Sequence, residues 1–165
     1  MVLYLDFDGV MHHENVLWHP KKGAYLHVPP GYELFQHASL LAELLEPFPE
    51  VQIVLSTSWA LQYGVTGAAK RLPEALQRRV IGGTFHSRHM SRSEFQYDKP
   101  RGLQVYEDVL RRRPRAWLAL DDTNEGWPPE AAGRFIQTDE NEGISDPEVL
   151  FEIKEKLLEM AGEQH

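Results

Sequence analysis

Five short apolar segments with the character of β-strands recur along the chain, and helical patterns occupy most of the intervals between them. The segments are residues 2–5, 51–55, 80–81, 116–120 and 134–137. Short apolar strands that alternate with helical patterns are typical of βαβ units, whose strands run parallel and are covered by helices. The pattern therefore predicts a three-layer, Rossmann-like α/β fold, in which a five-stranded, mainly parallel sheet carries helices on both faces.

Four helices are expected in these intervals. Apolar residues at three-and-four spacing predict a helix over residues 34–45, which two prolines end. Pro73 stands in the first turn of a second helix, and residues 104–112 form a third. The last helix starts at Asp146, a favourable N-cap followed by proline, and runs to about Met160.

The segment 11–31 has no helical period but contains two short apolar patches, so we expect a loop or a β-hairpin that forms a flap over the site. Its histidines match no compact metal-ligand spacing, and we interpret them as surface or substrate-contacting residues: His12, His13, His19 and His27. With 165 residues, the chain has the size of one ordinary domain, and a single domain over residues 1–165 is expected.

Composition excludes several kinds of site. The chain has no cysteine, which rules out disulfides, thiolate metal sites and a cysteine nucleophile. No apolar run approaches the roughly 18 residues of a membrane span, and the chain begins with a strand rather than a signal segment, so we expect a soluble cytoplasmic protein. The formal charge of −8 argues against broad electrostatic capture of nucleic acid, although a local basic groove is compatible with it. No obligate protein partner is evident.

Two of the predicted strands end in carboxylates. The first is followed by Asp6 and Asp8, which alternation along a strand places on the same side, and the fourth ends in Asp121 and Asp122. Ligand crevices in parallel sheets lie beyond the carboxyl ends of the strands. If the two strands are neighbours, Asp121 is positioned to complete a cation site with Asp6. Adjacent carboxylates repel unless a cation or a shared proton relieves them, so the pattern favours a hard divalent ion over simple turn residues.

Hydroxyl and basic side chains follow other elements. The second strand is followed by Ser56, Thr57 and Ser58, whose hydroxyls can hold phosphoryl oxygens or cap the next helix. Strand register decides which of them faces a ligand, and we favour Thr57, with Ser56 close behind. Lys99 and Arg101 precede the third helix, where a cation can meet a phosphate, although exposed basic residues are commonly only solvated.

These residues, in this order and on alternating elements, resemble the motifs of the haloacid dehalogenase (HAD) superfamily of phosphatases. The motifs are Asp6-Phe7-Asp8-Gly9-Val10, Ser56-Thr57, Lys99 and Asp121-Asp122. Further details resemble the HAD domain of the Swiss Army Knife RNA repair proteins: Ser56-Thr57-Ser58-Trp59, Gly83-Thr84, Arg101-Gly102, Leu120-Asp121-Asp122, and Thr138 followed by Gly143-Ile144-Ser145. The resemblance extends over nearly the whole chain.

The resemblance implies a HAD fold with a minimal cap and a Mg²⁺-dependent phosphomonoesterase activity. Asp6 is then the nucleophile, which forms an aspartyl-phosphate. Asp8 is the general acid for the leaving group and afterwards the base for the attacking water. The Asp6 side chain, the Asp8 carbonyl and Asp121 hold Mg²⁺, with Asp122 as a ligand or as a neighbour of the ligands.

The resemblance also assigns the phosphate contacts. Thr57 or Ser56 binds a phosphoryl oxygen, with Ser58 beside them, and Lys99 neutralises the phosphate and the nucleophile. Arg101 matches the subfamily pattern as well as Lys99 matches the superfamily pattern, so either cation, or both, can serve.

The segments between the motifs are short, so only the flap and a loop near residues 84–98 are available to cover the site. A shallow, open pocket of this kind admits a polymer end better than an enclosed pocket does. The expected substrate is a phosphorylated small molecule, a nucleotide or a nucleic-acid end. Two alternatives remain open. One is a non-catalytic or signalling module, similar to a receiver domain, and the other is a protein that binds RNA ends without catalysis. Asp8 argues for turnover, because a receiver domain lacks such a general acid.

Overall fold

A five-stranded sheet forms the centre of the computed structural model, which describes residues 1–86 and 91–163. The strands are β1 (Val2–Leu5), β4 (Gln52–Leu55), β5 (Val80–Gly83), β6 (Trp117–Asp121) and β7 (Phe135–Gln137). They lie in the order β5-β4-β1-β6-β7, and each neighbouring pair is parallel. The predicted parallel sheet is confirmed, and β1 lies at its centre between β4 and β6.

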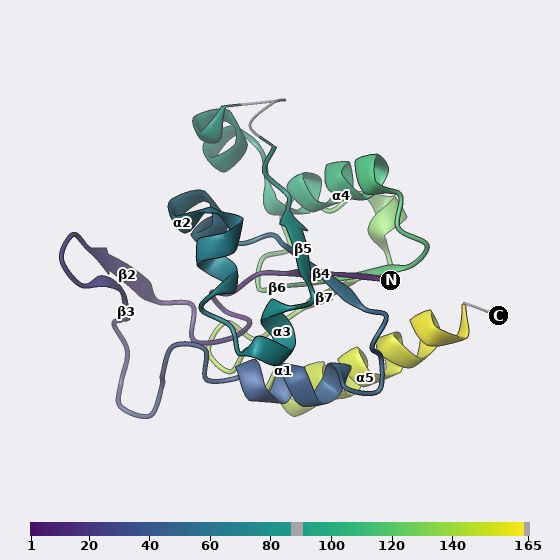
Figure 1. The fold of residues 1–165 in the computed structure, drawn as a ribbon, viewed down its shortest axis with the longest axis horizontal. Coiled ribbons are helices and arrows are strands. Elements are labelled where there is room, and N and C mark those ends of the chain that lie inside the picture. The colour runs from purple at the N-terminus through teal and green to yellow at the C-terminus, as the bar shows by residue number, and fades with distance from the viewer. Residues whose placement is uncertain (87–90, 164–165) are drawn as a thin grey trace.

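Alternating side chains of the central strand build two hydrophobic layers. Leu3 and Leu5 belong to the core that includes residues of α1 (Ala38–Leu45) and α5 (Pro147–Gly162). Tyr4 belongs to a second core with Val105 of α4 (Arg101–Arg112). Figure 1 shows α1 and α5 on one side of the sheet and α4 on the other. The predicted three-layer arrangement is therefore confirmed.

The helix boundaries differ from the sequence predictions in several places. The helix expected over residues 34–45 begins only at Ala38, because Phe35 has a left-handed backbone with φ of 56°. The helix expected from residue 104 begins three residues earlier, directly after Pro100, where proline is well tolerated. The helix expected at Pro73 is the single turn α3 (Glu74–Gln77). The N-cap expected at Asp146 is present, since its carboxylate accepts hydrogen bonds from two backbone N–H groups of the first turn.

Helix α2 (Ser58–Ala69) was not predicted. It contains two glycines, and Gly64 interrupts the helical backbone with φ of 75°. Intrinsic propensity therefore opposes this helix. Burial of Trp59 and Ala68 against the sheet core stabilises it, which is a tertiary contribution that local sequence does not reveal.

The segment 11–31 contains an antiparallel hairpin, formed by β2 (Val16–His19) and β3 (Gly23–Leu26). The hairpin projects from the body of the molecule beside α2 (Figure 1). Trp18 contacts this helix, with its ring centroid 5.2 Å from that of Trp59 and 5.5 Å from that of Tyr63. The single domain and the covering role of the flap stay predictions. Of the loop expected near residues 84–98, residues 87–90 lie outside the described part, and residues 94–98 form one π-helical turn.

A buried carboxylate ties α4 to the sheet. Asp108 accepts a 2.8 Å hydrogen bond from the Tyr4 hydroxyl and a 2.9 Å bond from Arg112 Nε, and His86 Nε2 lies 2.9 Å from its other oxygen. The network joins β1, α4 and the chain that follows β5. It therefore anchors the second half of α4 to the sheet.

None of the helices in the described ranges, residues 1–86 and 91–163, is both long enough and apolar enough to cross a lipid bilayer.

Candidate active site

Two aspartates lie side by side where β1 and β6 end. The register pairs Leu5 with Leu120, and the Asp6 N–H donates to the Leu120 carbonyl at 3.3 Å. Asp6 lies on the same face of the sheet as Tyr4, and Asp121 lies on the same face as Ala119. Tyr4 and Ala119 belong to the core on the α4 side of the sheet. The carboxylates of Asp6 and Asp121 are buried as a result, and they point to the N-terminus of α4.

Arg101, the first residue of α4, faces both carboxylates. Its Nη1 lies 3.1 Å from Asp6 Oδ1 and 3.4 Å from Asp121 Oδ2, and it also donates to the Ser56 carbonyl at the end of β4. A helix N-terminus favours negative charge, so the backbone of α4 adds to the positive potential at this point. Burial disfavours the Arg101 cation, but attraction to Asp6 and Asp121 outweighs it and raises the Arg101 pKa.

Gly102 fastens this helix terminus to the loop after β6. Its N–H donates to the Glu125 carbonyl at 3.0 Å. A Cβ at this position would stand 2.4 Å from the Trp127 nitrogen and 2.6 Å from the Gly126 carbonyl carbon, so the two backbones approach as closely as they do only because the residue is glycine. This contact helps to set the position of Arg101 relative to Asp121.

Lys99 has a different position. It forms an ion pair with Glu107 of α4. It also lines a pocket of about 350 Å³, together with Arg101, Thr123 and Glu125. Of the two cations that the motif pattern leaves open, the structure brings Arg101 between the strand ends and Lys99 to the adjacent pocket.

A third carboxylate joins the pair. Asp6, Asp121 and Asp122 each offer a carboxylate oxygen, and these oxygens lie within 4.8 Å of one another. Thr123 donates to Asp121 Oδ1 from its N–H at 3.0 Å and from its hydroxyl at 3.1 Å, whereas the buried Asp121 Oδ2 accepts no hydrogen bond from any residue that the structure describes. This oxygen is buried within a group of carboxylates, and Arg101 Nη1 lies 3.4 Å from it, so it fits the oxygen ligands that Mg²⁺ prefers.

The crowding of these groups disfavours their negative charges. Burial, reinforced by Asp121 and Asp8, raises the pKa of Asp6 to about 7, although Arg101 opposes the shift. Burial also raises the pKa of Asp121 to about 6, against the effect of Arg101. Burial and the charge of Asp6 raise the pKa of Asp122 to about 7. A divalent cation among the three would favour their ionised forms.

Asp8 is held apart from this cluster by two donors. His12 Nε2 and Trp59 Nε1 each lie 2.8 Å from the same oxygen, Asp8 Oδ1. The Asp8 side chain is 28 % exposed, while His12 and Trp59 are wholly buried. The interpretation of His12 as a surface or substrate-contacting residue is therefore wrong, while His19 and His27 are exposed and His13 is partly buried.

One sequence signal pointed to this burial. His12 follows the apolar pair Val10 and Met11, both fully buried, immediately after the turn at Gly9. The Gly9 N–H donates to the His12 carbonyl at 2.9 Å, which closes a tight loop and brings His12 back beside Asp8. Gly9 has a φ of 75°, and a Cβ there would collide with Asp122. The glycine thus admits both the turn and the close approach of Asp122.

The hydroxyl residues lie at the end of β4, next to Asp6. Thr57 Oγ1 accepts a 3.2 Å hydrogen bond from the Trp59 N–H and caps α2. Thr57 and Ser58 also line, with Arg101, a small pocket of about 40 Å³. The Ser56 N–H donates to the Leu5 carbonyl at 2.9 Å, so Ser56 sits across from Asp6 in the sheet register. Helix capping and proximity to the cation site therefore coexist at Thr57.

Comparison with protein families matches residues 2–149 to one described as the HAD domain in Swiss Army Knife RNA repair proteins. The matched range includes both acidic strand ends, the hydroxyl residues and Arg101. Neither a curated protein nor a solved structure matches the chain.

Proposed function

We propose that this chain is a Mg²⁺-dependent phosphomonoesterase. The premise is that the chain belongs to the family of HAD domains found in Swiss Army Knife RNA repair proteins. The family supports a HAD-type hydrolase or phosphatase related to RNA repair. The observation that carries the finer proposal is the contrast between two carboxylates two residues apart. Asp6 lies in the buried acidic cluster against Arg101, while Asp8 is partly exposed and held by His12 and Trp59. Such a contrast suits a nucleophile and a separate general acid.

In the first step, Asp6 attacks the phosphorus atom. Asp6 Oδ1 accepts a 2.8 Å hydrogen bond from the Phe7 N–H and faces Arg101, so Oδ2 is the oxygen that forms the new bond to phosphorus. The bond from phosphorus to the leaving oxygen breaks, and Asp8 gives its proton to that oxygen. The product on the protein is an aspartyl-phosphate at Asp6.

In the second step, water hydrolyses the aspartyl-phosphate. Asp8, now a carboxylate, takes a proton from the water while its oxygen bonds to phosphorus. The bond from phosphorus to Asp6 breaks, which releases inorganic phosphate and restores the Asp6 carboxylate. Asp8 thus ends the cycle protonated, as it began.

An anionic nucleophile and an anionic substrate repel each other, so the site needs positive charge. Arg101 supplies it from the N-terminus of α4, and Thr57 or Ser56 donates a hydroxyl to a phosphoryl oxygen. Bound Mg²⁺, held by Asp6, Asp121, Asp122 and the Asp8 carbonyl, would supply the remaining charge neutralisation.

The proposed substrate is a phosphorylated small molecule or a nucleic-acid end. The pocket of about 350 Å³ beside Arg101 is lined by Lys99, which we assign to the part of the substrate beyond the phosphate. Neither a membrane nor an obligate protein partner is part of the proposal, and the cytoplasm is the proposed location.

Replacement of Asp6 by Asn tests the proposal. The wild-type chain should hydrolyse p-nitrophenyl phosphate with Mg²⁺ and lose the activity in EDTA, and Asp6→Asn should abolish it. Glu152→Gln, on the exposed face of α5, is the matched control and should retain full activity. Mg²⁺-dependent hydrolysis by Asp6→Asn at the wild-type rate would refute the proposal.

The same preparations distinguish the other functions. A wild-type phosphoenzyme that persists for many minutes would indicate a signalling module instead of a phosphatase. Tight binding of a 3′- or 5′-phosphorylated oligonucleotide without hydrolysis would indicate a protein that only binds RNA ends. A panel of phosphorylated metabolites, nucleotides and oligonucleotides, assayed with and without Mg²⁺, would identify the substrate class.

A further inference from the structure

We infer that His12 and Trp59 are positioning residues that orient Asp8 so that its second oxygen, Oδ2, delivers the proton to the leaving group. The inference rests on the proposed function. Its basis is the convergence of two buried donors on a single oxygen, Asp8 Oδ1, at 2.8 Å each. We refer to His12 and Trp59 together as the acid clamp.

The backbone of Phe35 sets the tautomer of His12. The Phe35 N–H donates to His12 Nδ1 at 3.0 Å, so Nδ1 carries no proton. The ring proton of the neutral imidazole is then on Nε2, which faces Asp8 Oδ1. His12 is completely buried, so water does not compete for either nitrogen. The histidine therefore acts as a fixed donor to Asp8.

Trp59 is held just as firmly. Its indole is fully buried and contacts the rings of Phe7, Phe35, Trp18 and Tyr63, with centroids between 5.2 and 5.9 Å from its own. Rings packed on several sides leave the indole little freedom to rotate. Its Nε1–H consequently keeps a constant direction toward Asp8.

Two donors on Oδ1 restrict where Asp8 can carry a proton. A proton on Oδ1 would be repelled by the hydrogen atoms on His12 Nε2 and Trp59 Nε1, whereas a proton on Oδ2 points away from both donors. The Asp8 side chain is partly exposed, unlike the clamp. The acidic proton is thus held on the oxygen that remains available to a substrate, and the carboxyl plane is fixed for proton transfer.

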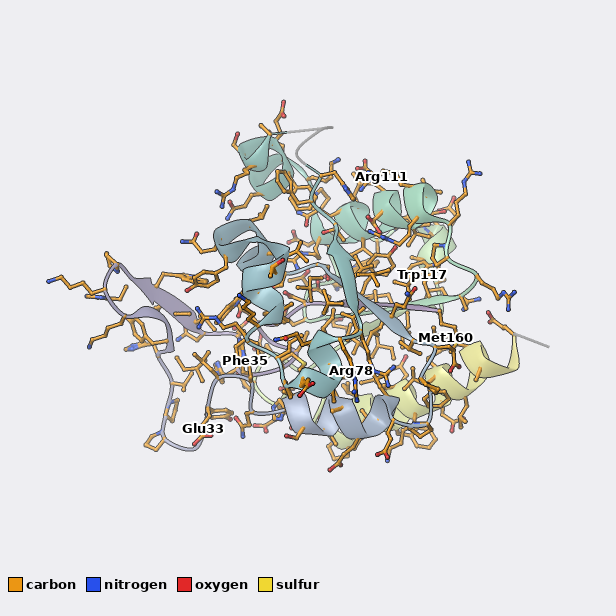
Figure 2. The ribbon with its side chains drawn as sticks, in the orientation of Figure 1. Glu33, Phe35, Arg78, Arg111, Trp117 and Met160 are labelled. Atoms are coloured by element: carbon orange, nitrogen blue, oxygen red, sulfur yellow. The ribbon has the colours of Figure 1, made fainter. Side chains whose placement is uncertain are left out.

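The acid clamp also connects Asp8 to the ends of the segment that carries the hairpin. His12 precedes β2 and Phe35 follows β3, so their hydrogen bond closes the segment that carries the hairpin. Phe35, labelled in Figure 2, lies where this segment returns to the body of the molecule. It adopts a φ of 56°, a conformation that a bulky residue rarely takes and that strains the backbone. The hydrogen bond from the Phe35 N–H to His12 Nδ1 explains why this residue keeps a strained backbone.

Trp59→Phe tests the inference, because it retains an aromatic ring in the packed cluster but removes the N–H donor. A misplaced general acid should slow the hydrolysis of alkyl phosphates, because their leaving oxygen needs a proton. It should slow the hydrolysis of p-nitrophenyl phosphate far less, because that leaving group departs as an anion. We expect kcat for an alkyl phosphate to fall about tenfold more than kcat for p-nitrophenyl phosphate. Trp117→Phe is the control, because Trp117 pairs with Val2 at the opposite end of the sheet, and it should leave the ratio of the two rates unchanged.

His12 supplies the second arm of the test. His12→Leu removes the donor and should lower the alkyl-to-aryl rate ratio, as Trp59→Phe does. His12→Gln offers an amide N–H near the position of Nε2 and should restore much of the ratio. A loss that is equal for both substrates in Trp59→Phe and His12→Leu would overturn the inference, since it is the result of a structural defect alone.

A spectroscopic measurement separates this inference from the proposed function. Failure of the wild-type chain to hydrolyse either phosphate would refute the phosphatase and not the clamp. The indole N–H proton of Trp59 is identified in the NMR spectrum by its loss in Trp59→Phe. In Asp8→Ala, this signal should move upfield because its hydrogen bond is lost. An unchanged signal would overturn the clamp whatever the activity.

Discussion

Replacement of Gly102 by Ala should destabilise the protein, although Gly to Ala in a helix normally does the reverse. Alanine in a helix is favoured over glycine by roughly 0.5–1 kcal/mol, because it restricts the unfolded chain. At Gly102, however, the new Cβ would stand 2.4 Å from the Trp127 nitrogen, and ordinary contact begins near 3.4 Å. The loop after β6 must therefore retreat by about 1 Å (3.4 − 2.4).

Forcing extra volume into a packed site costs about 1–3 kcal/mol, which exceeds the helical gain. After subtraction of the helical gain, we expect Gly102→Ala to lower the free energy of unfolding by about 0.5–2 kcal/mol. Gly162→Ala, in the last turn of α5, is the matched control, because a Cβ there meets no atom of the described residues within 4 Å. It should change the free energy of unfolding by less than about 1 kcal/mol, toward greater stability.

Urea denaturation followed by circular dichroism measures both values, and an unchanged m-value would show that the unfolded states are comparable. Retreat of the loop also moves Asp121 away from Arg101, so the affinity for Mg²⁺ and the phosphatase rate should fall with stability. A displacement of about 1 Å at a catalytic site can cost about a hundredfold in rate. Stability of Gly102→Ala equal to or above the wild type would refute the reasoning.

Two further predictions concern buried carboxylates. Burial opposes the negative charge of Asp108, but hydrogen bonds from Arg112 and Tyr4 outweigh burial and lower the Asp108 pKa. This carboxylate therefore stabilises the fold above its unfolded pKa of about 3.9, and the stabilisation is lost as the pH falls below that value. Asp108→Asn should cost about 3 kcal/mol at pH 7, and urea titrations should show the difference from wild type shrinking below about pH 4; a constant difference would contradict the assignment. The pKa of Asp122 is raised to about 7, so its contribution to stability is present below about pH 4 and lost as the pH rises to 7. In EDTA, Asp122→Asn should therefore have a higher melting temperature than the wild type at pH 8 but not at pH 4. Addition of Mg²⁺ should raise the melting temperature of the wild type more than that of Asp122→Asn. Equal increases would exclude Asp122 from the metal site.

Strands and their order along the chain could be read from the sequence because each depends on local pattern. Runs such as residues 2–5 and 116–120 are apolar on both faces, as strands covered by two layers of helices must be. The N-cap at Asp146 was equally local, because a carboxylate there reaches N–H groups only two and three residues away. These features need no information from distant parts of the chain.

Elements that depend on packing were predicted less well. Helix α2 has two glycines and a low intrinsic tendency to form, and it exists because Trp59 and Ala68 are buried against the sheet. The start of α1 was displaced because Phe35 takes a left-handed conformation and donates its N–H to His12. In both cases a tertiary contact overrides the local preference.

The sequence by itself determined the chemical groups at the strand ends: carboxylates at Asp6, Asp8 and Asp121, followed by hydroxyls and cations. The predicted parallel direction of the strands was enough to bring these groups to one edge of a sheet, because the carboxyl ends of parallel strands meet there. Only the tertiary structure decided how they are partnered. It set Arg101 against Asp6 and Asp121 while Lys99 pairs with Glu107, and it buried His12 beside Asp8. Pairing and burial depend on the packing of segments far apart in the chain, and local periodicity carries no record of them.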